Sequence, residues 1–312
     1  MNRSEIDSAS QRLHGDIGPF LRQTPLWKLP GQALGLACTE VWLKLEHIQV
    51  AGSFKARGML HRLRSNTLPG SGVIVASGGN AGIATAAAAR HLGVVCEVFV
   101  PEVSSLAKRE RLRELGASVT VTGASYAEAL AACLVRQRAT GALLTHAYDQ
   151  PEVVAGAGSL AQEIEAQAGL PGCVLVSVGG GGLIAGVASW FAGRSKVIAL
   201  EPEQAPTLHA ARAAGQPVDV AVGGIAADAL GAKRIGDIAW SCNGLIHDAL
   251  LLPDEAIRKA QLWLWRELHL AVEPAAALGL AALQTGAVAP DAGEPVCLIL
   301  CGGNVDPASL NG

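Results

Sequence analysis

The sequence predicts an α/β protein with two lobes of parallel β-sheet. Short aliphatic segments alternate with longer helical segments from residue 72 to residue 145, and again from residue 152 to residue 200. Strands that alternate with helices form βα units, whose strands lie parallel in one sheet. A chain of 312 residues is long enough for two such lobes, each with its own core. We therefore expect open twisted sheets with helices on both faces and a ligand in the cleft between the lobes.

The expected elements of the first lobe begin after a helix and an extended segment within the first forty residues. Val95–Val100 is a typical case: it is rich in β-branched residues and Pro101 stops it. On the same grounds the strands are predicted at 41–45, 72–76, 95–100, 118–121 and 142–145, and the helices at 55–64, 81–92, 105–115 and 126–140.

The second lobe is expected to follow residue 151 with the same alternation. Its predicted strands are 173–177, 197–200 and 296–300, and its predicted helices are 152–167, 183–191, 253–268 and 275–285. The roughly twenty residues after Gly215 show no clear pattern.

Composition and charge exclude several classes of protein. Half of the residues are hydrophobic and 16% are charged, which is typical of a folded protein and not of a disordered one. The net charge of −3 comes without a long run of one sign, so nothing indicates nucleic acid binding. No apolar run approaches the ~20 residues of a membrane-spanning helix, and the polar start lacks the apolar core that is typical of a secretory signal. Seven dispersed cysteines predict reduced thiols and a cytoplasmic location, without a disulfide framework or zinc site.

Lys55 is the central candidate for chemistry. It follows a Gly-Ser turn, and Ser53 is expected to be the N-cap of the helix that Lys55 enters. The helix dipole disfavours a positive charge in the first turn, and a shielded pocket would lower the pKa of the lysine. A neutral amine is what imine formation with a carbonyl group requires. Most lysines are instead solvated surface residues, so the loops that follow must support this interpretation.

Gly179–Gly182 follows a predicted strand and begins a helix. Four glycines leave the backbone N–H groups accessible, and the helix N-terminus adds partial positive charge, so the loop suits a phosphate. Its spacing matches neither the dinucleotide motif nor the lysine-containing nucleotide loop. The alternative interpretation is a flexible turn.

Two further polar loops follow predicted strands. Ser77–Asn80 offers a hydroxyl, backbone amides and a carboxamide, which suit a carboxylate and a phenolic oxygen; simple N-capping by Asn80 is the alternative. Cys301–Asn304 closes the last strand, at the edge where ligands bind in open α/β sheets, although a buried cysteine alone is more often a core thiol. With Lys55 and Gly179–Gly182, these loops supply what pyridoxal phosphate requires: an imine lysine, a phosphate cradle and a partner for the ring nitrogen.

The chain resembles the serine/threonine dehydratase group of pyridoxal-phosphate enzymes, which have the tryptophan-synthase-β type of fold (fold type II). Its motifs are most similar to the mammalian-type L-serine dehydratases. The resemblance covers nearly the whole chain and is carried by Thr24–Leu26, Trp42–Glu46, Gly52–Gly58, Ser77–Gly82, Lys108–Arg111, Gly179–Leu183, Glu201–Glu203, Val272–Pro274 and Cys301–Asn304. It implies a homodimer, a large cofactor-binding domain of residues 1–46 and 148–312, and a small domain of residues 47–147.

The resemblance also implies a role for each matched residue. Lys55 holds the cofactor as an imine and acts as the general base on the substrate Cα. Phe54 lies against the cofactor ring, and Asn80 bonds its 3′-oxygen. The cofactor phosphate and ring nitrogen are held by backbone amides and one thiol, from Gly179, Gly180, Gly181, Gly182, Leu183 and Cys301. The substrate carboxylate is surrounded by Ser77, Gly78, Asn80 and Ala81, with the Ser77 hydroxyl as a catalytic-site donor.

The implied reaction is an elimination of water from L-serine or L-threonine, giving pyruvate or 2-oxobutanoate and ammonia. A thiol at the ring nitrogen does not stabilise a protonated pyridine, and this favours rapid loss of a β leaving group. The nearest alternative is a β-replacement enzyme of the cysteine-synthase kind or another lyase of β-substituted amino acids. Those replacement enzymes carry Ser-x-Lys-Asp-Arg, whereas this chain has Ala56 after the lysine. A non-catalytic protein that binds the cofactor or an amino acid is the other alternative, and intact Lys55 and Asn80 argue against it.

Several positions depart from the family pattern. Ala81 replaces the histidine of threonine dehydratases and racemases, and Gly78 replaces the proton-donating serine of racemases, which disfavours racemisation. Glu201 matches a residue that binds a divalent cation in racemase-like members, but Thr207 replaces an aspartate there, so a monovalent cation on backbone carbonyls is the alternative. No appended regulatory domain is expected after the last strand. Serine and threonine differ by one methyl group, worth only ~1–3 kcal/mol of discrimination, and the sequence does not separate them.

Overall fold

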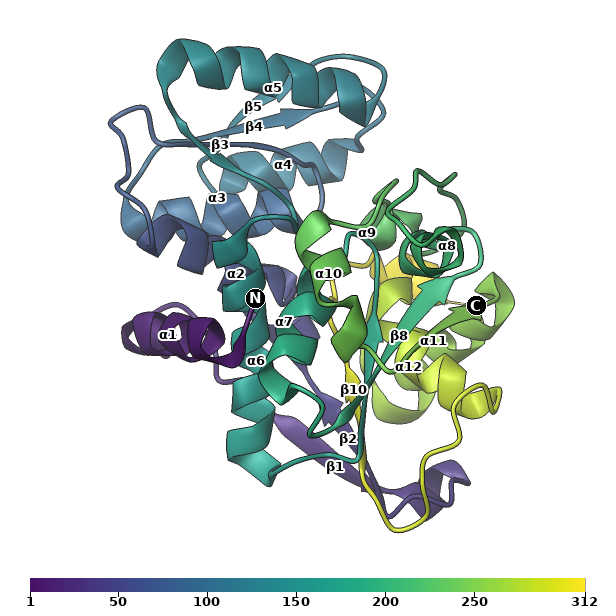
Figure 1. The fold of residues 1–312 in the computed structure, drawn as a ribbon. Coiled ribbons are helices and arrows are strands. Elements are labelled where there is room, and N and C mark those ends of the chain that lie inside the picture. The colour runs from purple at the N-terminus through teal and green to yellow at the C-terminus, as the bar shows by residue number, and fades with distance from the viewer. Residues whose placement is uncertain (312) are drawn as a thin grey trace.

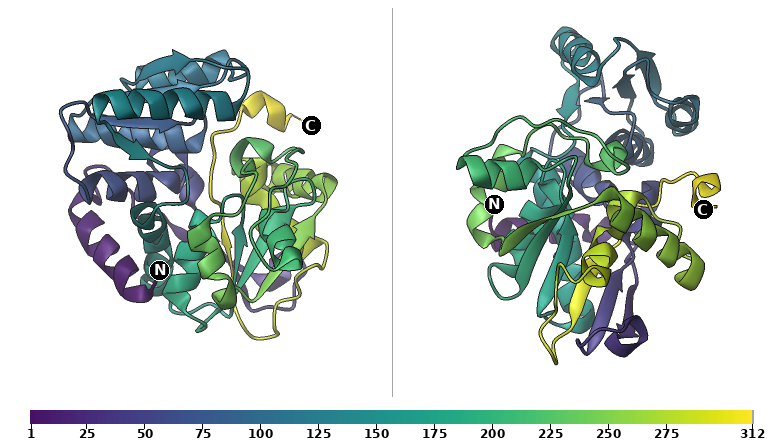
Figure 2. Two further views of the ribbon diagram at one scale, coloured as in Figure 1. Left: turned by 45° about the horizontal axis from the view of Figure 1, so that its top comes forward. Right: turned by 90° about the vertical axis from the view of Figure 1, so that its right-hand side faces the viewer.

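The computed structural model describes residues 1–311 and contains two β-sheets. The larger has the strand order β1-β2-β10-β7-β8-β9, and the smaller has the order β5-β4-β3-β6. Neighbouring strands are parallel throughout, except that β1 is antiparallel to β2. The two sheets lie in separate lobes, with the smaller one at the top of the ribbon (Figures 1 and 2). The predicted two-lobed α/β fold is confirmed.

The larger sheet is covered on both faces by helices. α7 contacts β7 and β8 on one face with α6 behind it, and α12 contacts the same strands from the other face with α11 behind it (Figure 1). The strands are β1 (Leu26–Pro30), β2 (Glu40–Lys44), β7 (Cys173–Ser177), β8 (Lys196–Pro202), β9 (Asp248–Leu252) and β10 (Val296–Ile299). The helices are α1 (Arg3–Leu13), α6 (Pro151–Ala168), α7 (Gly182–Phe191), α8 (Thr207–Ala214), α9 (Ala227–Leu230), α10 (Asp237–Ser241), α11 (Asp254–Leu268) and α12 (Pro274–Gln284).

The smaller sheet also has two covered faces, because successive side chains of a strand point to opposite sides. Val73 and Val75 of β3 join a core cluster with Ile83 and Leu112, which come from α3 and α4. The alternate residues of β3 pack instead with α5, through Cys133. The elements of this lobe are α2 (Lys55–Arg64), β3 (Val73–Ala76), α3 (Asn80–Leu92), β4 (Cys96–Val100), α4 (Leu106–Glu114), β5 (Ser118–Val121), α5 (Tyr126–Thr140) and β6 (Leu143–Thr145).

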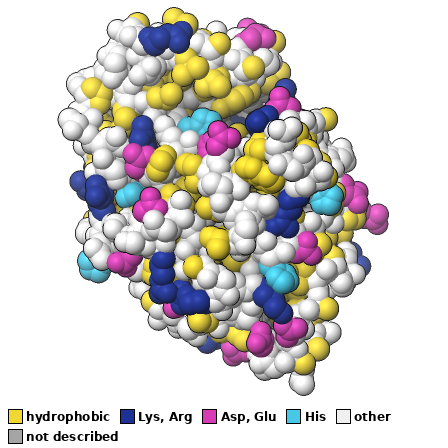
Figure 3. Space-filling view, in the orientation of Figure 1, with side chains coloured by type: hydrophobic (Ala, Val, Ile, Leu, Met, Phe, Trp, Pro, Cys, Tyr) yellow, Lys and Arg dark blue, Asp and Glu magenta, His cyan; other side chains and the backbone are white. Residues whose placement is uncertain are grey.

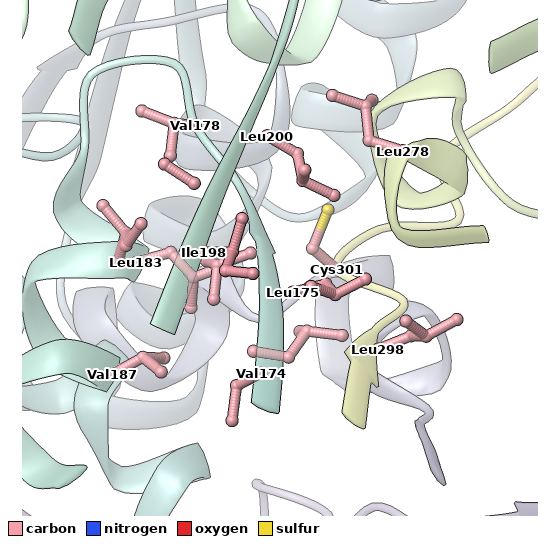
Figure 4. Close-up of a cluster of buried hydrophobic side chains, with 14 of the residues drawn as sticks. Val174, Leu175, Val178, Leu183, Val187, Ile198, Leu200, Leu278, Leu298 and Cys301 are labelled. Carbon is pink, nitrogen blue, oxygen red and sulfur yellow. The ribbon is translucent and has the colours of Figure 1, made fainter. Parts of the chain in front are cut away.

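The main hydrophobic core lies between the larger sheet and its helices (Figure 4). Its central strands read as continuous apolar runs, as expected for strands buried on both faces. Cys301, just past β10, belongs to the same cluster. Figure 4 labels Val174, Leu175, Val178, Leu183, Val187, Ile198, Leu200, Leu278, Leu298 and Cys301 of this core.

Most predicted elements are confirmed within one or two residues, and the helix 55–64 and the strand 118–121 have the predicted bounds. The sequence did not predict β1, β9 or the short helices α8, α9 and α10. Short 3-10 turns complete the described chain: η1 (His14–Asp16), η2 (Gly31–Leu34), η3 (Glu46–Ile48), η4 (Val50–Gly52), η5 (Asn243–Leu245) and η6 (Pro307–Leu310).

The strands of the smaller sheet fall within residues 47–147, and those of the larger sheet fall outside that range. The division into domains at those residues stays a prediction. Within residues 1–311, no helix combines the length and the apolar character that a membrane crossing requires. Acidic and basic side chains are interspersed over the molecular face in Figure 3.

Candidate active site

Lys55 is the first residue of α2 and extends toward the segment that links the lobes. Its Nζ donates a hydrogen bond to the Ala147 carbonyl at 2.6 Å and lies 5.0 Å from the centroid of the Phe54 ring. Part of the side-chain surface remains exposed, but protein atoms surround the amine, and this burial lowers the pKa of Lys55 to about 8. The amine therefore has a larger neutral fraction near neutral pH than an ordinary lysine, as imine chemistry requires.

Ser53 does not cap α2, so that prediction is wrong. The residue before the helix is Phe54, and no side chain caps the N-terminus. Ser53 has an extended backbone (φ −163°, ψ 161°), and its buried hydroxyl has no hydrogen-bond partner. The reason is a long-range contact: Ser53 forms an antiparallel bridge with Gly302, and the Phe54 N–H donates to the Cys301 carbonyl at 3.1 Å. This bridge holds the segment just before Lys55, called the lysine loop below, against the loop after β10.

A buried ionic cluster lies behind the lysine. Arg57, in the first turn of α2, donates to Glu46 at 2.7 and 2.9 Å and to both oxygens of Glu163 at 3.0 Å. Lys44 of β2 also binds Glu163, and the Thr24 hydroxyl donates to Glu46. Burial works against the charge of Arg57, but the two carboxylates outweigh it and raise its pKa above the usual value. The cluster ties β2, α2 and α6 together and fixes the first turn of α2.

The tetraglycine loop joins β7 to α7 and is packed too closely for side chains. Gly181 has φ +87°, which favours glycine. A Cβ on Gly180 would lie 2.3 Å from the Tyr148 ring, and one on Gly182 would lie 2.8 Å from the Tyr148 carbonyl oxygen. The first N–H groups of a helix lack partners within it, so the loop and the start of α7 can bind an anion. The alternative of a flexible turn does not fit this packing.

Asn80 begins α3, and its side chain does not cap that helix, since the N-cap is Gly79. The Asn80 Nδ2 donates to both carboxylate oxygens of Glu273, at 3.0 and 2.9 Å. Its Oδ1 accepts a hydrogen bond from Asn304 Nδ2 at 2.7 Å. The capping alternative is therefore wrong, and the carboxamide is held by side chains from the other lobe.

Glu273 is the residue at this site whose part the sequence did not reveal. It precedes Pro274 at the start of α12 and is 5% exposed. Burial raises the pKa of Glu273 to about 7, although the hydrogen bonds from Asn80 and the Asn304 N–H act in the opposite direction. The only local signal is its place in the motif Val272–Pro274, which does not indicate which residue Glu273 bonds to.

Cys301 lies past the end of β10, among the buried side chains of Figure 4. Burial raises the pKa of its thiol to about 12, so the thiol is neutral at physiological pH. A neutral thiol suits a neutral pyridine nitrogen. The Cys301 carbonyl accepts a hydrogen bond from the N–H of Phe54, the residue before Lys55. The backbone therefore links the residue that carries the thiol to the residue next to the lysine.

The remaining carboxylate-loop residues lie together at the turn between β3 and α3. Ser77 and Gly78 are partly exposed, and Ala81 is buried in the first turn of α3. A Cβ on Gly82 would lie 1.8 Å from the Ser77 carbonyl oxygen, so this turn requires a glycine. Leu183 is buried in the first turn of α7, next to the tetraglycine loop.

Glu201 is engaged by the start of α8. One oxygen accepts from the Thr207 hydroxyl at 2.9 Å and the Leu208 N–H at 2.8 Å, and the other accepts from the His209 N–H at 2.8 Å. Among residues 1–311, no group of three or more histidine, cysteine, aspartate or glutamate side chains could hold a metal ion. The cation role of Glu201 stays a prediction.

The residues present fit pyridoxal phosphate. Ala147 binds the Lys55 amine, and the neighbouring Tyr148 packs on the tetraglycine loop, so amine and anion cradle are joined by one short segment. The loop after β10 contacts both the lysine loop and Asn80. An amine, an anion cradle, a thiol and a carboxamide therefore face one region at the carboxyl ends of the strands, where ligands bind in such sheets.

Comparison with known proteins agrees with this geometry. The family model described as "Pyridoxal-phosphate dependent enzyme" matches residues 17–302. The chain belongs to this family. It is 35% identical over 277 residues to an L-threonine ammonia-lyase of Geobacter sulfurreducens, covering 87% of this chain and 69% of that protein. It is 36% identical over 312 residues to a human protein named serine dehydratase-like, covering 93% of each. The structure of maize serine racemase has a TM-score of 0.90 at 28% identity, covering 99% of this chain and 95% of that one.

Proposed function

We propose that this pyridoxal-phosphate dependent enzyme is an ammonia-lyase that eliminates water from L-serine or L-threonine, releasing a 2-oxo acid and ammonia. The observation that carries the proposal is the Lys55 amine, whose pKa is lowered to about 8 by burial and which is linked through Ala147 and Tyr148 to the tetraglycine loop. The similarity to an L-threonine ammonia-lyase and to a serine dehydratase-like protein supports the same class of reaction.

Different residues of the chain bind the cofactor phosphate and transfer the proton. The backbone amides of Gly179, Gly180, Gly181, Gly182 and Leu183 hold the phosphate of the cofactor. When bound, the cofactor withdraws electrons from the substrate Cα. Lys55 binds the cofactor, and its amine takes the proton from Cα. The lowered pKa of Lys55 raises the fraction of the amine that is unprotonated and can accept that proton.

The substrate and the cofactor ring are oriented by side chains from both lobes. The loop of Ser77, Gly78, Asn80 and Ala81 binds the substrate carboxylate, with the Ser77 hydroxyl as donor. Asn80 also donates to the cofactor 3′-oxygen, Phe54 lies against the ring, and the neutral Cys301 thiol faces its nitrogen. Without a carboxylate at that nitrogen, the ring is not held protonated, which favours elimination.

Gly78 favours elimination over racemisation. Racemisation needs a proton donor on the face of the substrate opposite Lys55, and a glycine at position 78 has no side chain to donate a proton.

The test is a coupled assay of 2-oxo acid release from L-serine, L-threonine and other β-substituted amino acids. Wild-type protein and the control Lys259→Ala, at an exposed position on α11, should both release 2-oxo acid. Chiral analysis of the remaining amino acid in the same reactions should find no D-enantiomer. Formation of D-serine at a rate matching 2-oxo acid release would contradict the proposal. The proposal would also fail if no amino acid in the panel gave any 2-oxo acid.

We also propose a homodimer in the cytoplasm, with a small domain of residues 47–147 and a large one of the remainder. The cytoplasmic location is supported by seven free cysteines, all of them buried. The homodimer is supported by the family resemblance, and light scattering of the purified protein tests it. A monovalent cation near Glu201 is tested by comparing activity in potassium and in a bulky organic cation.

A further inference from the structure

Glu273 is buried between the lobes, and within residues 1–311 no basic side chain is bonded to it. Its hydrogen-bond donors are neutral amides: the Asn80 carboxamide and the Asn304 N–H. A buried carboxylate usually has a cationic partner, because burying an unpaired charge is costly. The charged cluster around Arg57 shows that this protein builds such pairs elsewhere, so the neutral surroundings of Glu273 call for a functional explanation.

The contacts of Glu273 fix the orientation of Asn80. The carboxylate can only accept hydrogen bonds from Asn80 Nδ2, and Asn304 Nδ2 donates to the opposite end of the same carboxamide. A second Asn304 Nδ2 bond, to the Ala51 carbonyl at 2.8 Å, anchors this arrangement to the lysine loop. The Asn80 amide therefore presents its N–H side to Glu273.

Glu273 also lines a cavity of about 220 Å³ between the lobes. The charged residues around this cavity are Lys108 of α4, Asp228 of α9 and Asp306 in the last loop. Lys108 and Asp228 form an ion pair across the lobes, and both lie close enough to act on Glu273: Asp228 raises its pKa and Lys108 lowers it. Cys301 is also buried close enough for the charge of Glu273 to raise the pKa of its thiol.

We propose that Glu273 is a positioning residue of the active site: its carboxylate orients the Asn80 carboxamide, and its charge state tunes the cofactor through that amide. The inference rests on the proposed contact between Asn80 and the cofactor 3′-oxygen. Ionised Glu273 accepts both Asn80 bonds and the Asn304 bond, whereas protonated Glu273 loses acceptor capacity and its negative charge. Asp228 and Lys108 shift the pH at which this change occurs in opposite directions.

The test is a pH titration of the visible absorbance of the purified holoenzyme without substrate. Wild-type enzyme should show a transition near pH 7, where Glu273 titrates. Glu273→Gln should lack that transition, and Glu273→Asp should keep one. Glu273→Gln also turns one acceptor into a donor that faces the Asn80 donor. We therefore expect kcat at pH 8 to fall about tenfold, with a smaller change in KM.

Two variants away from the cofactor keep the test independent of folding at position 273. Asp228→Asn removes a negative charge and should move the transition to lower pH. Lys108→Met removes a positive charge and should move it to higher pH, and the double variant should return it toward the wild-type value. A merely structural role of Glu273 would not produce these opposite shifts.

Asn80→Ala separates failure of this inference from failure of the proposed function. Altered absorbance in Asn80→Ala together with an unchanged curve in Glu273→Gln would overturn the role of Glu273 alone. Unchanged absorbance in Asn80→Ala would remove the cofactor contact on which the inference depends. Identical titration curves for wild type, Asp228→Asn and Lys108→Met would also overturn it.

Discussion

Gly180→Ala is the sharpest test of the tetraglycine loop. The added Cβ would lie 2.3 Å from Tyr148 Cγ and 2.4 Å from both ring Cδ atoms. Carbon atoms in favourable contact are about 3.5–4.0 Å apart, so the ring must retreat by more than about 1 Å. Rotation of the ring about the Cβ–Cγ bond leaves Cγ in place, so ring rotation alone cannot relieve the overlap. Either Tyr148 must leave its present χ1 rotamer, or the backbone of Tyr148 or of the loop must shift.

The expected cost of this overlap is about 1–3 kcal/mol in the free energy of unfolding. Because a shift of the loop moves the amides that hold the phosphate, the affinity for pyridoxal phosphate should fall by roughly tenfold or more. Urea denaturation of the apoprotein measures the first quantity, and equilibrium dialysis with the cofactor measures the second.

Gly70→Ala is the matched control. No atom lies within 4 Å of the notional Cβ of Gly70, so this change should alter the unfolding free energy by less than about 0.5 kcal/mol. Adding Tyr148→Ala to Gly180→Ala removes the overlapping ring and should restore part of the lost cofactor affinity. If Gly180→Ala binds the cofactor as tightly as Gly70→Ala does, the phosphate-loop reasoning is refuted.

Three further predictions concern the surroundings of Lys55. The rate at which the apoprotein reacts with pyridoxal phosphate should rise with pH through a midpoint near pH 8 and level off above it, since the neutral amine predominates only above the lowered pKa of Lys55; a midpoint above about pH 10, as for an ordinary lysine, would contradict this. Arg57→Met leaves Glu46 and Glu163 buried without their guanidinium partner and should lower the unfolding free energy by roughly 3–5 kcal/mol in urea titrations; a loss below about 1 kcal/mol would speak against the buried cluster. Cys301 should resist alkylation in the native protein at pH 8, because its thiol has a pKa of about 12, and rapid labelling detected by mass spectrometry would contradict that burial.

The elements with strong local signals were predictable from the sequence. The helix 126–140 has the predicted bounds because Ser125 caps it, accepting from the Glu128 N–H, and Gly141 ends it in the left-handed conformation. β1 was not predicted as a strand, because it is a short edge strand that ends in Pro30. β9 was missed for another reason: Asp248–Leu252 has no strand pattern of its own and is a strand because it pairs with β8.

The candidate site was predictable where residues act through local motifs, and not where distant residues meet. Lys55 and the tetraglycine loop each lie in a motif with its own chemistry. Glu273 and Asn80 are hydrogen-bonded but lie 193 positions apart in the sequence, and the local sequence around either residue does not indicate the other as its partner. Ser53 shows the reverse case: a local capping signal was overridden by the bridge to Gly302.

The role of Lys55 is tested most directly by 2-oxo acid release from L-serine and L-threonine by wild-type protein and by Lys55→Ala, measured beside the control Lys259→Ala. We expect release by wild type and by Lys259→Ala, and loss of both release and visible cofactor absorbance in Lys55→Ala. Undiminished release by a correctly folded Lys55→Ala protein would contradict the assignment of Lys55 as the residue that binds the cofactor and moves the proton.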